Sequence, residues 1–142
     1  MDKLFLDANI WFSAARSPEG GSGYIIRLAK KDKIKLSITS QIIAEVEKNL
    51  RKKENNAVLL QHFENFFTTN PKLVLISKKD TIKYSDIINS KDALIIAGAI
   101  KSKSNYLVTL DKKHFFTSDI ANAKLPITIV MPEMYLQKFI NQ

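Results

Sequence analysis

The chain has 142 residues, with 22 Lys or Arg against 14 Asp or Glu and a formal net charge of +8. This length suits a single domain over residues 1–142. The absence of cysteine excludes disulfides, thiol catalysis and cysteine metal sites. No apolar segment is long enough for a membrane span or signal peptide, so we expect a cytoplasmic protein with no membrane partner. The positive charge favours an anionic partner such as nucleic acid, although it also serves solubility.

Short apolar strands and helices alternate along the chain. In order, the pattern predicts a strand at 4–7, a loop at 7–23, a helix at 24–31, a strand at 35–39, and helices at 41–53 and 57–67. It then predicts a strand at 73–76, helices at 81–88 and 91–103, a strand at 106–110, a loop, a strand at 127–130 and a helix at 132–140. Ser40 and Ser90 are the predicted N-caps of two helices.

The strands are rich in Leu, Ile and Val on both faces, which is typical of a parallel sheet covered by helices on both sides. We therefore predict an α/β fold with three layers, α/β/α, around a mostly parallel sheet of short strands. In such sheets, functional sites form beyond the carboxyl ends of the strands.

Four acidic residues stand at the edges of these apolar segments. Asp7 ends one predicted strand, Asp111 directly follows another, Glu45 lies within a helix, and Asp92 lies in the first turn of another helix. Carboxylates that converge repel one another, and hard divalent cations with oxygen ligands relieve that repulsion. An acidic metal pocket in a basic protein indicates cleavage of a phosphodiester.

Each acid alone also has a structural explanation. Asp7 can cap a turn, Asp111 can be a turn residue, and Asp92 can be a favourable charge at a helix N-terminus. Helix geometry does not choose between Glu45 and Glu47, because they lie on opposite flanks of the buried face. The functional hypothesis depends on four acids at corresponding places in one α/β pattern.

Two polar residues near these acids are supporting candidates. Asn9 can satisfy a local turn, or it can orient Asp7 or a metal-bound water. Thr109 can cap locally, or it can lend its hydroxyl to the acidic pocket. Of the two histidines, His62 is predicted to be a structural or surface residue, and His114 is assigned a packing or surface role rather than a catalytic one.

Four segments in this order resemble the PIN domain, the fold of metal-dependent nucleases that includes the VapC-type toxins. They are Leu-Asp-Ala-Asn-Ile at 6–10, the helix at 40–50, Lys-Asp-Ala-Leu-Ile-Ile-Ala at 91–97, and Tyr-Leu-Val-Thr-Leu-Asp at 106–111. The resemblance runs from Leu4 to about Phe115. Its register favours Glu45 over Glu47 as the second acid.

The resemblance implies a divalent-metal-dependent endoribonuclease that hydrolyses RNA without a side-chain nucleophile. Asp7, Asp92 and Asp111 would hold one or two Mg²⁺ or Mn²⁺ ions, and Glu45 would contribute directly or through water. These four carboxylates are the predicted catalytic and metal-binding residues.

The implied partners are RNA, a small antitoxin protein if the chain is a toxin, and a second copy of the chain. Phe63, Phe66 and Phe67 suggest a homodimer, but core burial explains them equally well. Two other functions stay open from the sequence. One is a non-catalytic PIN-like module for RNA binding or assembly, and the other is a metal hydrolase that acts on a small substrate.

Three residues depart from the family pattern. Ala8 replaces the usual Thr, Leu110 stands where Gly is common, and Lys113 stands where some members carry a further acid. They leave the four main carboxylates in place and imply a weaker metal site. Arg16, Lys112 and Lys113 are candidates for binding RNA phosphates, or they are solvated turn residues.

Overall fold

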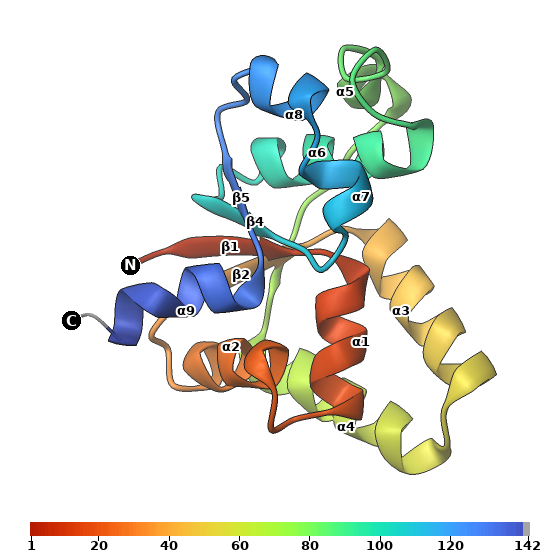
Figure 1. Ribbon diagram of the computed structural model, residues 1–142. Coiled ribbons are helices and arrows are strands. Elements are labelled where there is room, and N and C mark those ends of the chain that lie inside the picture. The colour runs from red at the N-terminus through yellow and green to blue at the C-terminus, as the bar shows by residue number, and fades with distance from the viewer. Residues whose placement is uncertain (141–142) are drawn as a thin grey trace.

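The computed structural model describes residues 1–140 and contains a five-stranded sheet at its centre (Figure 1). All strands are parallel, in the order β3-β2-β1-β4-β5. The strands are β1 (Lys3–Leu6), β2 (Lys35–Ile38), β3 (Lys72–Leu73), β4 (Tyr106–Val108) and β5 (Thr128–Val130). The predicted fold class is confirmed, and the parallel pairing is complete rather than partial.

Helices cover both sides of the sheet (Figure 1). One group comprises α1 (Ala8–Arg16), α2 (Gly21–Lys30), α3 (Ser40–Lys53), α4 (Asn56–Thr69) and α9 (Pro132–Ile140). The other comprises α5 (Lys78–Ile82), α6 (Ser90–Lys101), α7 (Lys112–Phe115) and α8 (Ser118–Asn122). Within residues 1–140, every helix is too short or too polar to cross a membrane.

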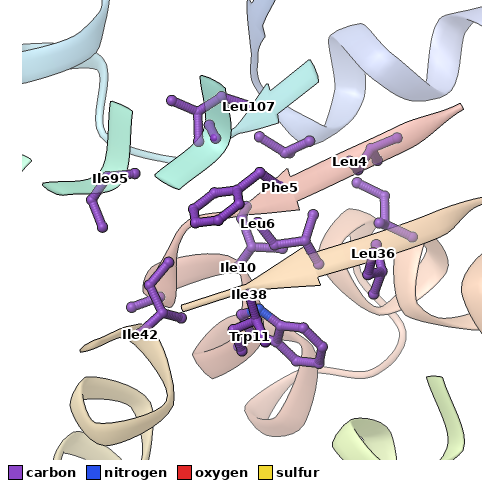
Figure 2. Close-up of a cluster of buried hydrophobic side chains, with 14 of the residues drawn as sticks. Leu4, Phe5, Leu6, Ile10, Trp11, Leu36, Ile38, Ile42, Ile95 and Leu107 are labelled. Carbon is purple, nitrogen blue, oxygen red and sulfur yellow. The ribbon is translucent and has the colours of Figure 1, made fainter. Parts of the chain in front are cut away.

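The central strand β1 explains why its sequence is apolar throughout. Leu4, Phe5 and Leu6 are completely buried, because β1 lies between β2 and β4 and has helices on both faces (Figure 2). Successive strand residues point to opposite faces, so a strand covered on both sides needs apolar residues at every position. The apolar run therefore places β1, and the residue that follows it, at the centre of the fold.

The predicted loop at 7–23 is wrong, because α1 begins directly after β1. Ile10, Trp11, Ala14 and Ala15 have helical spacing and are buried against the core. The turn residues at 17–20 only separate α1 from α2. Because α1 is short and the turn residues follow it directly, the turn signal in the sequence outweighed the helical pattern.

Both predicted N-caps are displaced by one residue. Thr39, not Ser40, caps α3, and its hydroxyl accepts the backbone N–H of Ile42. Asn89, not Ser90, caps α6. Each wrong cap stood beside another residue that can cap a helix, and the pattern of apolar residues does not distinguish neighbours.

Three further predicted elements differ from the structure. The strand expected at 73–76 pairs only over Lys72–Leu73, and the helix expected at 81–88 is replaced by α5, which ends at Ile82. The loop expected after residue 110 contains α7 and α8. These segments are short and mostly exposed, so few buried apolar residues define their limits.

The aromatic residues of α4 are divided between the core and the surface. His62 is buried beside Trp11, with ring centroids 6.1 Å apart, which confirms a structural role. Phe63 and Phe66 pack against the core, as burial alone would require. Phe67 is 72% exposed and is the one of the three phenylalanines that the core does not explain.

Helix α6 packs so closely on the sheet that one of its positions has no room for a side chain. A Cβ atom at Gly98 would lie 2.8 Å from Thr39 Cγ2 and 2.9 Å from Phe5 Cζ. We expect Gly98→Ala to lower the free energy of unfolding by about 1–3 kcal/mol, although alanine is the better helix former. Urea unfolding measures the loss. Gly20→Ala is the control, because its added Cβ meets nothing closer than 3.5 Å; equal losses would contradict this packing argument.

Candidate metal centre

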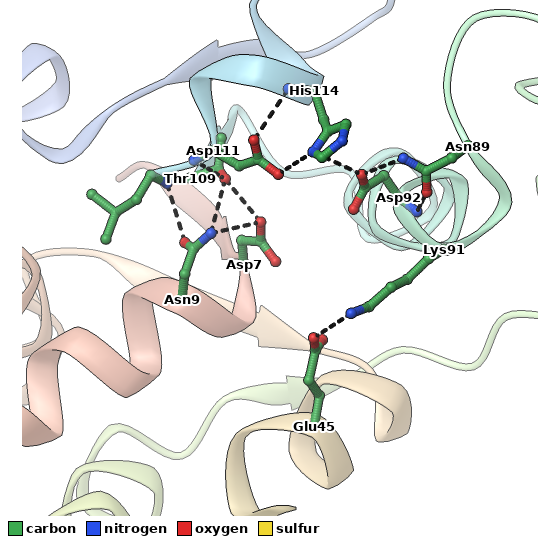
Figure 3. A network of polar contacts seen from close by, with 10 residues as sticks. Asp7, Asn9, Glu45, Asn89, Lys91, Asp92, Thr109, Asp111 and His114 are labelled. Atoms are coloured by element: carbon green, nitrogen blue, oxygen red, sulfur yellow. Dashed lines mark hydrogen bonds and ion pairs between the residues drawn. The ribbon is translucent and has the colours of Figure 1, made fainter. Parts of the chain in front are cut away.

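The four acids converge at the carboxyl edge of the sheet although they come from separate segments (Figure 3). Asp7 follows β1, Asp111 is the N-cap of α7, Asp92 lies in the first turn of α6, and Glu45 projects from α3. All four line one cavity of about 240 Å³. The other lining residues are Ala8, Asn9, Phe12, Asn49, Lys53, Lys91 and Ile95.

Asp7 is the most buried of the four, with 7% of its surface exposed. One carboxylate oxygen accepts the backbone N–H of Ala8, and the other accepts the hydroxyl of Thr109 at 2.8 Å. Burial raises the pKa of Asp7 to about 6; the charges of Glu45 and Asp92 also raise it, while the two hydrogen bonds oppose the shift. The cavity therefore concentrates negative charge that the protein compensates only in part.

Asn9 and Thr109 tie the ends of β1 and β4 together. The amide of Asn9 donates to Asp7 Oδ2 at 3.2 Å, and its carbonyl oxygen accepts the backbone N–H of Leu110 at 3.1 Å. Thr109 is completely buried and also accepts the backbone N–H of Asp111 at 3.1 Å. Both residues thus join the Asp7 carboxylate to the backbone that leads into Asp111.

Asn89 orients Asp92 through a reciprocal pair of hydrogen bonds. Its side-chain oxygen accepts the backbone N–H of Asp92 at 2.9 Å, and its amide donates to Asp92 Oδ2 at 2.7 Å. Asp92 is therefore not the N-cap of α6. The Asn89 amide holds the Asp92 carboxylate in place while that carboxylate lines the cavity.

His114 lies at the edge of the cavity, where its ring bridges two acids. Its Nδ1 atom is 2.7 Å from Asp111 Oδ2 and 3.7 Å from Asp92 Oδ2. Burial opposes ionisation of Asp111, but its bonds with the ring and backbone of His114 and the charge of Lys113 lower its pKa. The expected surface role therefore does not fully describe His114, because its ring also contacts two predicted site residues.

Glu45 faces the cavity and Glu47 does not. Lys91 Nζ lies 3.0 Å from Glu45 Oε1, so this ion pair joins α6 to α3 at the cavity (Figure 3). The bond and the charge of Glu45 raise the pKa of Lys91, and Asp92 and Asp7 add to the effect. Glu47 pairs instead with Arg51, one turn along the same helix, at 2.9 Å.

The three basic residues expected to bind phosphate do not line the cavity. Arg16 lies at the end of α1 and pairs with Glu54 at 3.2 Å. Lys112 and Lys113 are exposed on α7, beside Asp111 but outside the hollow. Of the three, Lys113 acts on the acidic centre through its charge, which lowers the pKa of Asp111.

Sequence reasoning missed several cavity residues, among them Phe12, Asn49, Lys53 and Lys91. Asn49 follows Glu45 by one helical turn, and that spacing could have indicated a shared face. Lys91 is adjacent to Asp92 in the sequence, yet its pairing with α3 depends on how the two helices pack. Phe12 belongs to the helix that was mistaken for a loop.

The residues present fit a hard divalent cation. Single ligand atoms of Asp92, Asp111 and His114 all lie within 4.8 Å of one another, and Asp7 and Glu45 line the same hollow. Oxygen donors predominate, which suits Mg²⁺ or Mn²⁺ better than a softer metal. A cation would also favour the ionised form of Asp7, whose pKa is raised by burial and, to a lesser extent, by the charges of Glu45 and Asp92.

A family model described as a PIN domain matches residues 3–113 of the sequence. This match covers the four acids and all strands except β5. No curated protein matches the sequence.

Solved structures of low sequence identity share the fold. VapBC2 from Rickettsia felis, bound to a DNA fragment from its promoter, is 22% identical, with 90% of this chain and 96% of that chain covered and a TM-score of 0.60. PAE2754 from Pyrobaculum aerophilum is 16% identical, with coverage of 99% and 91% and a TM-score of 0.63. FitAcB from Neisseria gonorrhoeae is 14% identical, with coverage of 92% and 98% and a TM-score of 0.61.

Proposed function

Because the chain belongs to the PIN domain family, we propose that it is a divalent-metal-dependent endoribonuclease. The observation that carries the proposal is the convergence of Asp7, Glu45, Asp92 and Asp111 on one cavity in a protein of net charge +8. The raised pKa of Asp7 supports it, since it reflects first the burial of this carboxylate and then the nearby charges of Glu45 and Asp92, an arrangement that costs stability.

In this proposal, Asp7, Asp92 and Asp111 are the principal ligands and Glu45 acts directly or through water. A bound Mg²⁺ or Mn²⁺ ion would lower the pKa of a coordinated water and neutralise charge on the scissile phosphate. The protein's own contribution is orientation. Bonds to neighbouring side chains fix the carboxylates of Asp7, Asp92 and Asp111 before the RNA arrives, which lowers the entropic cost of reaction.

We extend the proposal to a toxin held in check by a small antitoxin. Its support is the shared fold with VapBC2 and FitAcB, together with the resemblance to VapC-type toxins. The exposed side chain of Phe67 is consistent with a protein contact, such as one in a homodimer. The alternative, a non-catalytic RNA-binding or assembly module, would keep RNA affinity without a need for divalent cations.

The test is cleavage of a mixed RNA pool by purified protein, in Mg²⁺, in Mn²⁺ and in EDTA. We expect cleavage with either cation and none in EDTA, and the activity should follow the protein through a final size-exclusion column. Folded protein that binds RNA but does not cleave it with either cation would favour the alternative. Cleavage that persists in EDTA would contradict the metal-dependent mechanism.

Lys91 places a positive charge beside Glu45 at the cavity, and a metal ion must compete with this charge for the Glu45 carboxylate. Removal of this charge frees Glu45, so we expect Lys91→Met to bind Mg²⁺ about 3- to 5-fold more tightly, the range expected of an exposed ion pair. Calorimetric titration of the metal-free protein measures this change. Lys101→Met is the control, because Lys101 belongs to the same helix and pairs with Asp80, away from the cavity. Unchanged or weaker binding in Lys91→Met would contradict the prediction.

A further inference from the structure

A second hollow meets the acidic cavity along helix α3. Its lining includes Gln41, Ala44, Lys48 and Leu94. It shares Glu45, Asn49, Lys91 and Ile95 with the acidic cavity, so the two hollows meet where the Glu45–Lys91 pair joins α3 to α6. We call these two adjoining hollows together the α3 groove.

Two lysines in the α3 groove have charges that the protein does not neutralise. Lys53 lines the acidic cavity and Lys48 lines the second hollow. Within residues 1–140, neither lysine forms an ion pair, whereas Glu45 and Glu47, the acids on α3, pair with Lys91 and Arg51. Both lysines are exposed, so their ammonium groups can reach a ligand in the groove. Unpaired positive charges in both hollows, beside the acidic centre, favour a polyanion that extends from one hollow to the other.

The groove also offers apolar surfaces between its charges. Phe12 lines the acidic cavity, and Leu94 and Ile95 line the second hollow. Bases that are not paired can stack on an aromatic ring or pack on aliphatic side chains. In a duplex the bases are paired and stacked inside the helix, so only a single strand can present its bases to these surfaces.

We infer that the α3 groove binds single-stranded RNA, with Lys48 and Lys53 contacting phosphates that flank the scissile one. This inference rests on the proposed function and deepens it, because it assigns the path of the substrate. The path runs along α3 and α6 instead of over α7, where Lys112 and Lys113 were the sequence candidates.

The test measures RNA binding by fluorescence anisotropy in EDTA, so that no cleavage occurs. Two double variants are compared with the parent protein: Lys48→Gln with Lys53→Gln, and Lys112→Gln with Lys113→Gln. Both remove two exposed positive charges, so they are matched in net charge. The ligand is a short unstructured RNA with a fluorescent label, and the competitor is a duplex of the same sequence.

We expect the groove variant to weaken RNA binding about tenfold and to reduce the slope of log K against log salt by about 1.4, since each phosphate contact on a single strand contributes about 0.7. The α7 variant should change the affinity by less than about twofold, because Lys112 and Lys113 line neither hollow. The duplex should compete poorly. Equal losses in the two variants, or equal competition by the duplex, would overturn the inference.

Cleavage assays separate this inference from the proposed function. In the groove variant, the KM for RNA should rise while kcat is retained, because the acids are intact. If the parent protein binds RNA with the expected pattern but never cleaves it, the endoribonuclease proposal fails and the groove stands. If the parent protein cleaves RNA and only the α7 variant loses affinity, the groove fails and the endoribonuclease stands.

Discussion

Asp92→Asn is expected to lower metal-dependent RNA cleavage by about 10²- to 10³-fold, which corresponds to several kcal/mol of lost charge stabilisation. The fold should tolerate the change. An asparagine has the same shape, its oxygen can still accept the Asn89 amide, and the backbone bond that caps α6 does not involve the Asp92 side chain. Single-turnover cleavage with saturating Mg²⁺, alongside circular dichroism of both proteins, measures the effect.

Glu45 and Glu47 provide a matched pair for the same assay, because both are glutamates of α3 engaged in ion pairs. Glu45→Gln should lower cleavage by about 10- to 100-fold, the range for residues that support a metal centre. Glu47→Gln should leave it nearly unchanged, since Glu47 does not line the cavity. Full activity in Asp92→Asn, or equal losses in the two glutamate variants, would place the catalytic centre elsewhere.

The sequence predicted the central features of the fold because those features depend on buried apolar runs. The runs at Leu4–Leu6 and Tyr106–Val108 became the adjacent strands β1 and β4. Once two parallel strands are adjacent, the residues after them must meet at one edge of the sheet. The strand pattern therefore predicted that Asp7 and Asp111 lie at the same edge of the sheet, and the pairing of β1 with β4 makes them neighbours there.

What the sequence could not predict depends on contacts between elements. The helical wheel left Glu45 and Glu47 equivalent, and only the packing of α6 against α3 brings Lys91 to Glu45. The contact of His114 with Asp92 likewise joins two segments that no local pattern relates. Asn89 and Ser90 are both good caps, and the choice follows from the bond of Asn89 to the Asp92 carboxylate. Local propensity locates the elements, whereas tertiary packing decides which polar side chains face one another.

Asp7→Asn is expected to stabilise the protein when divalent cations are absent. The pKa of Asp7 is raised from 3.8 to about 6, so the folded state binds this proton more tightly than the unfolded state. Stability from this group is therefore greatest below about pH 4 and is lost as the pH rises through about 6, a loss of up to about 3 kcal/mol. Asparagine avoids the buried charge, and it caps helices as well as aspartate does.

The expected gain at about pH 8 is about 1–2 kcal/mol, less than the full penalty, because Thr109 must reverse its hydrogen bond to accept from the new amide and the Asn9 amide loses its Asp7 acceptor. At about pH 4 the gain should vanish, since Asp7 is then neutral in the folded protein. Urea unfolding in EDTA at the two pH values measures both differences. Asp119→Asn, at an exposed acid of α8 outside the cavity, controls for charge removal as such.

Addition of Mg²⁺ should reverse the order of the two proteins at about pH 8. A ligand that binds only the folded state adds about 2.7 kcal/mol at a hundredfold excess over its Kd, and this benefit should reach the parent protein but not Asp7→Asn. This reversal in the order of stability would distinguish a metal centre from an acidic cluster with only a structural role. A structural cluster would leave Asp7→Asn the more stable protein with or without the cation. If Asp7→Asn is the less stable protein in EDTA, the carboxylate of Asp7 contributes more to the fold through its hydrogen bonds than burial of its charge costs.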